Sequence, residues 1–291
     1  MLLGLTQQQE IFFRDNFKLS YHLPYLDICA QKIPLCGLDV LEVGGALPAS
    51  LVIDHLHCKS WTAVEAPSYD QELGEANQFH RNLAEQRRLE ELNQRYRHYY
   101  CNAEDLGEEH HDSYDLIFSI ACFEHINRLP LALSKMLRCL KPGGKLFTMH
   151  SPIWSAYDGH HLPIGIPERF NQKASHQAYV FKPWGHLLQN RSETYADISS
   201  RFDQEFAEEV IYSTYNSNHI NRYFSEDYHS VFSSSEFALL EYQITFLRQP
   251  TPEIQQALES RYPGYKQFSN NGIYAILQKP IFSAMPSLVT F

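Results

Sequence analysis

The 291-residue chain lacks several features that would assign its class at once. It has no uninterrupted apolar run long enough to span a bilayer, and its first residues show neither the basic region nor the apolar run of a signal peptide. Its six cysteines include no C-x-x-C pair, which disfavours a disulfide framework or a zinc site. We therefore expect a cytoplasmic protein with reduced thiols and no membrane partner.

Basic residues are also in short supply. The chain has 24 Lys and Arg against 34 Asp and Glu, which gives a formal net charge of −10. Because an acidic chain repels phosphate backbones, we expect no nucleic-acid partner. The arginines of a predicted helix over residues 69–97 alternate with glutamates, which indicates a solvated face or a subunit contact and leaves a homodimer open.

Strands alternate with helices over the first 150 residues. Apolar runs predict strands at 38–45, 61–66, 98–103, 114–121 and 145–151. Helical spacing predicts helices at 17–33, 48–56, 69–97 and 128–140, the last with Asn127 as its N-cap and the turn "KPGG" after it. This alternation is typical of an α/β, doubly wound, mostly parallel sheet, in which ligands bind at the carboxyl ends of the strands.

The pattern changes after residue 150. Residues 151–222 are rich in Tyr, His, Asn and Ser and show few strand runs, which predicts a lid insertion after the fifth strand. A helix at 225–232 capped by Ser225, a strand at 237–247, a helix at 251–262 and a strand at 272–280 complete a seven-stranded sheet. We therefore expect an N-terminal helical cap (1–34), a cofactor-binding core (35–150), the lid (151–222) and a C-terminal part of the core (223–291).

The first strand runs into "LEVGGALP", residues 41–48, with two glycines where a dinucleotide signature has three. Pro48 removes one backbone donor that a pyrophosphate would use, which disfavours NAD or FAD. Glu65 ends the second strand about 20 residues later, where an acidic side chain can accept hydrogen bonds from ribose hydroxyls. The two features together favour a nucleoside ligand without phosphate, such as S-adenosylmethionine.

The run "YDLIFSIACFEHINRLPLALSKMLRCLKPGGKLF" (114–147) resembles the fourth strand, following helix and fifth strand of class I S-adenosylmethionine-dependent methyltransferases, small-molecule enzymes of the type 11-like group. "FEHI" and "LKPGG" are its most telling pieces, and "LEVGG", "AVEA" and "CNAEDL" resemble further motifs of that family. The resemblance implies a Rossmann-like fold, S-adenosyl-L-methionine as cofactor with S-adenosyl-L-homocysteine as product, and methylation of a small molecule.

The resemblance also implies roles for individual residues. Glu65 would hold the ribose, Asn102 and the backbone of Ala103 would bind adenine, and Ser119 to Ala121 would run beneath the sulfonium. Gly44, Gly45 and Glu42 would line the methionyl portion.

Acceptor-side residues follow from strand ends and from the composition of the lid. If the acceptor is a hydroxyl or an ammonium, a base must take its proton, and histidine suits neutral pH. The candidate bases are His125, His150, His160 and His161. Tyr21, Trp154 and Tyr157 are candidates for the acceptor pocket. Asp158, His160 and His161 are candidate metal ligands, but adjacent histidines rarely bind one ion and no further ligand follows from the spacing, so we expect no metal.

Three interpretations remain at this point. The first is a small-molecule methyltransferase that transfers to oxygen or nitrogen in natural-product or secondary metabolism. The second is a cofactor-binding or regulatory protein of the same fold without transfer activity. The third, a nicotinamide-dependent oxidoreductase, explains neither "FEHI" nor "LKPGG".

Overall fold

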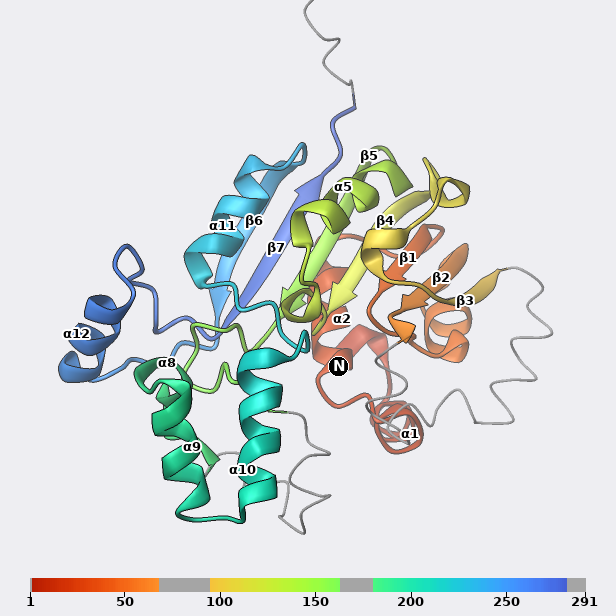
Figure 1. Ribbon diagram of the computed structural model, residues 1–291. Coiled ribbons are helices and arrows are strands. Elements are labelled where there is room, and N and C mark those ends of the chain that lie inside the picture. Colours follow the sequence, from red (N-terminus) through yellow and green to blue (C-terminus); the bar gives the residue numbers. More distant parts are fainter. Residues whose placement is uncertain (1, 68–94, 163–179, 282–291) are drawn as a thin grey trace, which may run out of the picture.

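The computed structural model describes residues 2–67, 95–162 and 180–281 (Figure 1). Its centre is a seven-stranded sheet in the order β3-β2-β1-β4-β5-β7-β6. The strands are β1 (Asp39–Val43), β2 (Ser60–Glu65), β3 (Tyr96–Tyr100), β4 (Tyr114–Ile120), β5 (Leu140–His150), β6 (Ala238–Thr245) and β7 (Gly272–Gln278). β1 to β5 pair in parallel, whereas β7 runs antiparallel to both β5 and β6. The carboxyl ends of the parallel strands therefore meet at one edge of the sheet.

Helices connect these strands and extend beyond them. They are α1 (Gln7–Phe17), α2 (His22–Lys32), α5 (Leu129–Cys139), α8 (Gly185–Leu188), α9 (Arg191–Ser199), α10 (Gln204–Ile211), α11 (Ser225–Ser234) and α12 (Pro252–Arg261). Short helical turns are η1 (Leu2–Gly4), η2 (Ser50–His55), η4 (Ala103–Asp105), η5 (Glu108–His110), η6 (Phe123–His125) and η8 (Tyr212–Asn216). Of the helices in the described ranges, none is both long and apolar enough to cross a membrane.

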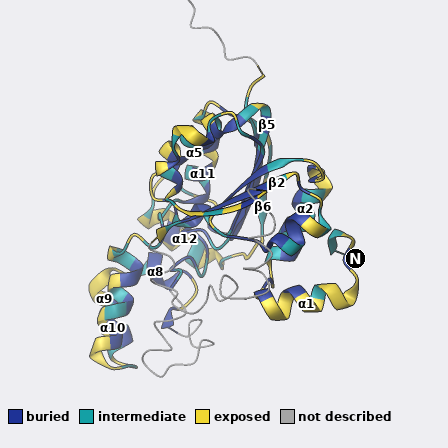
Figure 2. Ribbon diagram, turned by 90° about the vertical axis from the view of Figure 1, so that its right-hand side faces the viewer, coloured by how far each residue is buried: buried dark blue, intermediate teal, exposed yellow. Residues whose placement is uncertain are grey.

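The core lies on both faces of the sheet because side chains alternate along each strand. Val40 faces one layer, where α2 and η2 contribute Leu26 and Leu51. Its neighbour Leu41 faces the other layer, where Met136 of α5 and Phe232 of α11 pack. The strands are accordingly buried along most of their length, while the outer faces of α1, α9 and α10 are exposed (Figure 2).

The insertion between β5 and α11 forms its own small helical cluster. α9 and α10 pack against each other and project beyond the carboxyl edge of the sheet (Figure 1). Asn190 caps α9 through a capping box with Glu193, and the Asp203 carboxylate accepts from the Phe206 N–H at the start of α10. Phe206 and Ile198 are buried between the two helices.

The doubly wound sheet and its seven strands confirm the predicted fold class. The predicted helix over 69–97 lies mostly outside the described residues, and its last two residues are wrong because Tyr96 and Arg97 already belong to β3. α1 was not predicted. "KPGG" is not a separate turn after α5 but the start of β5, beside a shift in pairing register between Tyr114 and Leu116.

Two predicted helix caps are also wrong. α5 begins at Leu129, one residue later than expected, and the Asn127 amide instead donates to the Asn218 carbonyl at 2.7 Å. Ser225 is the first helical residue of α11 rather than its cap, and Asp227 accepts from the Phe224 N–H. At Asn127 a contact to a segment distant in sequence replaces the expected cap. At Ser225 the Asp227 carboxylate is the local acceptor instead of the serine hydroxyl.

Candidate functional site

A cavity of about 580 Å³ opens at the carboxyl ends of β1 to β4. This volume lies within the range of small-molecule sites, roughly 300–1,000 Å³. One side is formed by the strand ends and the turns after them, and the other by the segment that follows α10. Its lining residues are Val43, Gly44, Val64, Glu65, Ala66, Cys101, Asn102, Ala103, Glu104, Ala121, Cys122, His125, Ile126, Asn127, Arg128, Tyr212, Ser217, Asn218 and His219.

Gly44 brings the end of β1 against the end of β4. Its φ of +86° lies in the left-handed region that favours glycine, and its N–H donates to the Val64 carbonyl at 2.9 Å. A Cβ at this position would lie 2.1 Å from the Cys122 Sγ atom and 2.4 Å from its Cβ. The two strand ends can therefore approach this closely only because residue 44 has no side chain.

The loop after Gly44 is fixed by Glu42 rather than by further glycines. The Leu47 N–H donates to the Glu42 carboxylate at 2.8 Å, and the Trp61 indole N–H donates to the same oxygen at 2.6 Å. Burial raises the pKa of Glu42 to about 7, although both hydrogen bonds oppose this shift. The Leu47 side chain is buried in the core, and neither it nor Pro48 lines the cavity. Glu42 and Gly45, which were expected to line the methionyl portion, do not line the cavity.

Glu65 lies at the end of β2 and is only 4% exposed, yet it lines the cavity. Its Oε2 atom is 3.9 Å from the His98 Nε2 atom of the neighbouring strand β3. Asn102 and Ala103 follow β3 and line the same end of the cavity, and the Asn102 amide donates to Asp105 at 2.9 Å. Two strand ends thus bring one buried carboxyl group, one amide and the backbone of Ala103 to one side of the cavity.

The end of β4 forms the floor between the two sides. Ser119 does not line the cavity, because its hydroxyl donates to the Val43 carbonyl at 2.8 Å and ties β4 to β1. Ala121 does line it and has a φ of +47°, which turns the chain sharply out of the strand. Cys122 and η6 follow directly.

His125 ends η6 and faces the segment after α10. Its Nδ1 atom pairs with the His219 carbonyl oxygen. Asn221 reinforces the same junction, because its amide donates to the Phe123 and Ile126 carbonyls at 2.7 and 3.1 Å. η6 and residues 217–221 are therefore held together by side-chain to backbone hydrogen bonds.

Glu124, inside the "FEHI" motif, was not singled out from the sequence. It is fully buried, and its carboxylate oxygens make no side-chain hydrogen bond among the described residues; only the backbone of Glu124 and Ser151 lies close enough to favour its charged form. Burial raises its pKa to about 8. Burial raises the pKa of Tyr25 and Tyr228, and the nearby Glu124 carboxyl group raises both further. A carboxyl group of this kind is protonated at neutral pH, and its ionisation at higher pH destabilises the folded protein.

His150 and His160 do not line the cavity. His150 is fully buried between the Phe123 and Tyr228 rings, its Nδ1 atom lies 3.2 Å from the Thr148 hydroxyl, and burial lowers its pKa to about 3. His160 stacks on Phe181, and burial likewise lowers its pKa to about 3. Both histidines are packed into the interior, outside the cavity lining.

The three aromatic candidates for the acceptor pocket also lie outside the lining. Trp154 packs against His186, with ring centroids 4.7 Å apart. Tyr157 lies under the Arg248 guanidinium, 4.1 Å from the ring centroid. Tyr21 is 44% exposed and stacks on His22. The lid loop uses its aromatic side chains for packing.

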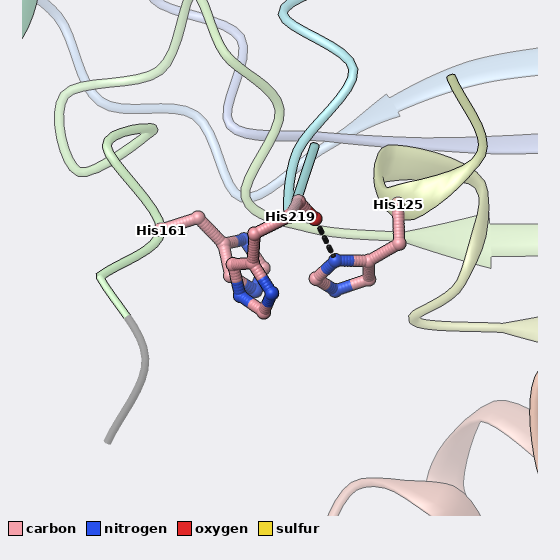
Figure 3. Close-up of side chains that lie close together, drawn as sticks. All are labelled: His125, His161 and His219. Carbon is pink, nitrogen blue, oxygen red and sulfur yellow. Dashed lines mark hydrogen bonds between the residues drawn. The ribbon is translucent and has the colours of Figure 1, made fainter. Parts of the chain in front are cut away.

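His161 does join His125, at a place where His219 also arrives (Figure 3). One nitrogen from each of the three rings lies within 4.8 Å of the other two, an arrangement that could hold a metal ion. Asp158 and His160 are not part of this group, so the ligand set weighed from the sequence is not assembled. The expectation of no metal is untested.

Sequence reasoning missed the second side of the cavity, which consists of Tyr212, Ser217, Asn218 and His219. The only signal was compositional, because residues 151–222 are rich in Tyr, His, Asn and Ser. No spacing rule indicates which part of such a segment returns to the strand ends. Arg128 and Glu104, which also line the cavity, lie 4.0 Å apart and are the charged pair at its rim.

Comparison with known proteins bears on this site. Residues 70–148 match a family model described as a methyltransferase domain. The search of curated proteins found no match. A phosphoethanolamine N-methyltransferase 2 from Haemonchus contortus, solved in complex with S-adenosyl-L-methionine, is 15% identical with a TM-score of 0.48. The alignment covers 88% of this chain and 52% of that one, so the chain spans about half of that protein's length.

Two further solved structures are similar to a comparable degree. An S-adenosylmethionine-dependent methyltransferase from Mesorhizobium loti is 12% identical with a TM-score of 0.47, covering 89% of this chain and 98% of that one. A chain in a complex that contains the Haloferax volcanii Trm112 methyltransferase activator is 12% identical with a TM-score of 0.45, covering 94% and 95%.

The methyltransferase-domain match covers residues 70–148, and its described part lies on the doubly wound seven-stranded sheet. The matched residues run from the segment after β2 to the end of β5 and include η4, η6 and α5. They therefore contain Asn102, Ala103, Ala121 and His125, which line the cavity.

Proposed function

We propose that the chain transfers a methyl group from S-adenosylmethionine to an oxygen or nitrogen atom of a small molecule at the cavity described above. The observation that carries this proposal is the convergence of Gly44, Glu65 and the Asn102–Ala103 turn on one cavity. When bound, the cofactor supplies an activated methyl group on a positively charged sulfur. The S–CH₃ bond breaks as the new bond to the acceptor forms, the sulfur becomes a neutral thioether, and the acceptor releases a proton.

The residues present suit such a cofactor. The Glu65 carboxylate can accept two hydrogen bonds from ribose hydroxyls, because it ends β2 and reaches the cavity from a buried position. Asn102 and the backbone of Ala103 can pair with the edge of adenine. Gly44 leaves the backbone open where a side chain would fill the space beside Cys122. Ala121 and Cys122 then lie where the sulfonium would be expected.

The acceptor would lie on the other side of the cavity, against Tyr212 and residues 217–219. His125 is the proposed general base on that side, because it lines the cavity and its ring is held by the His219 carbonyl. The net charge of −10 supports a neutral or cationic acceptor over nucleic acid. Methyl transfer requires in-line alignment and exclusion of water, which an enclosed second side of this kind can provide.

Calorimetric titration with S-adenosylmethionine tests the proposal. The wild-type protein should bind it, and Glu65→Ala should weaken binding by about 1.5–3 kcal/mol through lost charge-assisted hydrogen bonds. Glu109→Ala is the matched control, because its side chain is 73% exposed, lies outside the cavity lining and carries the same charge. Absence of binding by a folded wild-type protein would defeat the proposal. Equal affinity of the Glu65 and Glu109 variants would remove the ribose assignment.

A further inference from the structure

Three histidines from separate segments converge at the acceptor side of the cavity. His125 ends η6, His161 lies in the loop after β5, and His219 follows η8 (Figure 3). Their ring centroids lie 4.6 Å apart for His125 and His161, 4.8 Å for His125 and His219, and 5.5 Å for His161 and His219. One nitrogen of each ring lies within 4.8 Å of the other two.

The His125 ring is oriented by a backbone group. A carbonyl oxygen can only accept, so the bond from Nδ1 to the His219 carbonyl places the proton of a neutral ring on Nδ1. The lone pair is then on Nε2. Histidines that bind metals are typically fixed by such a bond to a backbone carbonyl, which sets both the tautomer and the ring orientation. The Asn127 and Asn221 amides hold the two segments in this relation.

His161 reaches this group from a tight loop. Its Nδ1 atom is buried and makes no hydrogen bond of normal geometry among the described residues, while the Pro152 backbone lies close to the ring. Its φ of +47° is a conformation that few side chains other than Asn, Asp and His adopt. A Cβ on Gly159 would lie 2.3 Å from the Ile153 carbonyl oxygen, so the loop before His161 has little room to move. The loop therefore holds the His161 ring beside His125 and His219, as a metal ligand requires.

We propose that His125, His161 and His219 bind one divalent transition-metal ion of the Zn²⁺ type, with a further coordination position open to the cavity. Three imidazoles without a carboxylate suit Zn²⁺ and its first-row neighbours rather than Mg²⁺ or Ca²⁺. Tetrahedral Zn–N bonds of roughly 2.0–2.1 Å place ligand nitrogens about 3.4 Å apart, so the rings must rotate inward on binding.

The open position would face the acceptor side, because His125 and His219 both line the cavity. There the ion would take an oxygen donor of the acceptor, such as a hydroxyl or carboxylate, and favour its ionised form. This part rests on the proposed methyl transfer. It also sharpens the role of His125, whose Nε2 lone pair then binds the metal instead of accepting a proton.

Metal binding is measured on the full chain without a polyhistidine tag, after removal of metals with a chelator. Titration with ZnCl₂ should show one equivalent bound, and CoCl₂ should give the visible absorption of a tetrahedral site. His161→Gln and His219→Gln should each weaken Zn²⁺ binding more than about 100-fold, since even outer partners of metal ligands contribute 10–100-fold. His229→Gln on α11 is the control, because this histidine is exposed and outside the group.

Zinc-edge X-ray absorption of the wild-type protein tests the ligand set without any variant. A shell with three imidazole nitrogens supports the proposal, whereas a sulfur ligand or fewer than three imidazoles overturns it. Failure to bind Zn²⁺, or equal binding by the folded His161 and His229 variants, overturns it as well.

Titration of the metal-free protein with S-adenosylmethionine separates this proposal from the previous one. If the cofactor binds but Zn²⁺ does not, only the metal site is wrong. If Zn²⁺ binds with three imidazoles but the cofactor does not bind, the metal site stands and the proposed methyl transfer fails.

Discussion

Replacement of Gly44 by alanine should lower the free energy of unfolding for two separate physical reasons. The first is conformational, because a φ of +86° costs a residue with a Cβ about 1–2 kcal/mol. The second is steric, because the added Cβ would overlap the Cys122 Sγ and Cβ atoms at 2.1 and 2.4 Å. Overpacking of this kind costs typically 1–3 kcal/mol. Gly44→Ala should therefore lower the free energy of unfolding by about 2–5 kcal/mol.

Gly37→Ala is the matched control. Its φ of +80° is nearly the same, but a Cβ there would meet no atom within 4 Å. It should therefore lose only the conformational part, about 1–2 kcal/mol. In a Cys122→Gly background, which removes both overlapping atoms, Gly44→Ala should cost no more than Gly37→Ala does. The steric part thus appears as a coupling energy in a double-mutant cycle.

Urea unfolding of the wild type, the three single variants and the double variant gives the free energies, and calorimetry gives their affinity for S-adenosylmethionine. We expect Gly44→Ala to weaken cofactor binding and Gly37→Ala to leave it unchanged, since Gly37 lies outside the cavity lining. Equal stability losses at Gly44 and Gly37 would refute the close approach of β1 and β4. A loss at Gly44 that Cys122→Gly does not relieve would show that the overlap lies elsewhere.

Three further predictions concern the same region. Because burial raises the pKa of Glu124 from 4.5 to about 8, the native state binds more protons between these values, and stability is lost as the pH rises through this window. Glu124→Gln should remove this loss, on the order of 3–5 kcal/mol, in urea unfolding at pH 5 and 8.5; an unchanged difference between the two pH values would contradict it. Asn221→Ala should destabilise by about 2–4 kcal/mol, because two carbonyls lose their donor, whereas Asn127→Ala, which loses an exposed bond, should cost about 1 kcal/mol or less. Similar urea midpoints for the two variants would argue against the junction at Asn221. Leu47→Gly should cost about 3–6 kcal/mol, since Leu47 is buried in the core, without tightening cofactor binding in calorimetry; tighter binding would show that a third glycine was missing after all.

The sheet was predictable because its signals are local. Apolar runs such as 114–121 and 272–280 are bounded by turn residues, and strands of this kind are buried whatever their order. The motif resemblance then placed Gly44, Glu65 and Asn102 at one edge, and the structure places all three in the lining of one cavity. Their proposed contacts with a cofactor stay predictions.

The second side of the cavity was not predictable, because it depends on contacts between distant segments. The His219 carbonyl pairs with the His125 ring, and the Asn221 amide donates to the Phe123 and Ile126 carbonyls beside it. No sequence pattern links these residues. The wrong cap at Asn127 has the same origin, since its amide is used by Asn218. His150 and the lid aromatics failed to reach the cavity because their apolar surfaces pack into the core.

The two sides of the cavity come from different parts of the chain, and this has a consequence for engineering. Gly44, Glu65 and Ala103 belong to the sheet and its first turns, whereas Tyr212, Ser217 and Asn218 belong to the insertion before α11. Under the proposed methyl transfer, a combinatorial library confined to those three insertion positions would diversify the molecule's choice of partner compound while leaving the sheet scaffold untouched. Such a chain is suited to directed evolution by exchange of a single short segment.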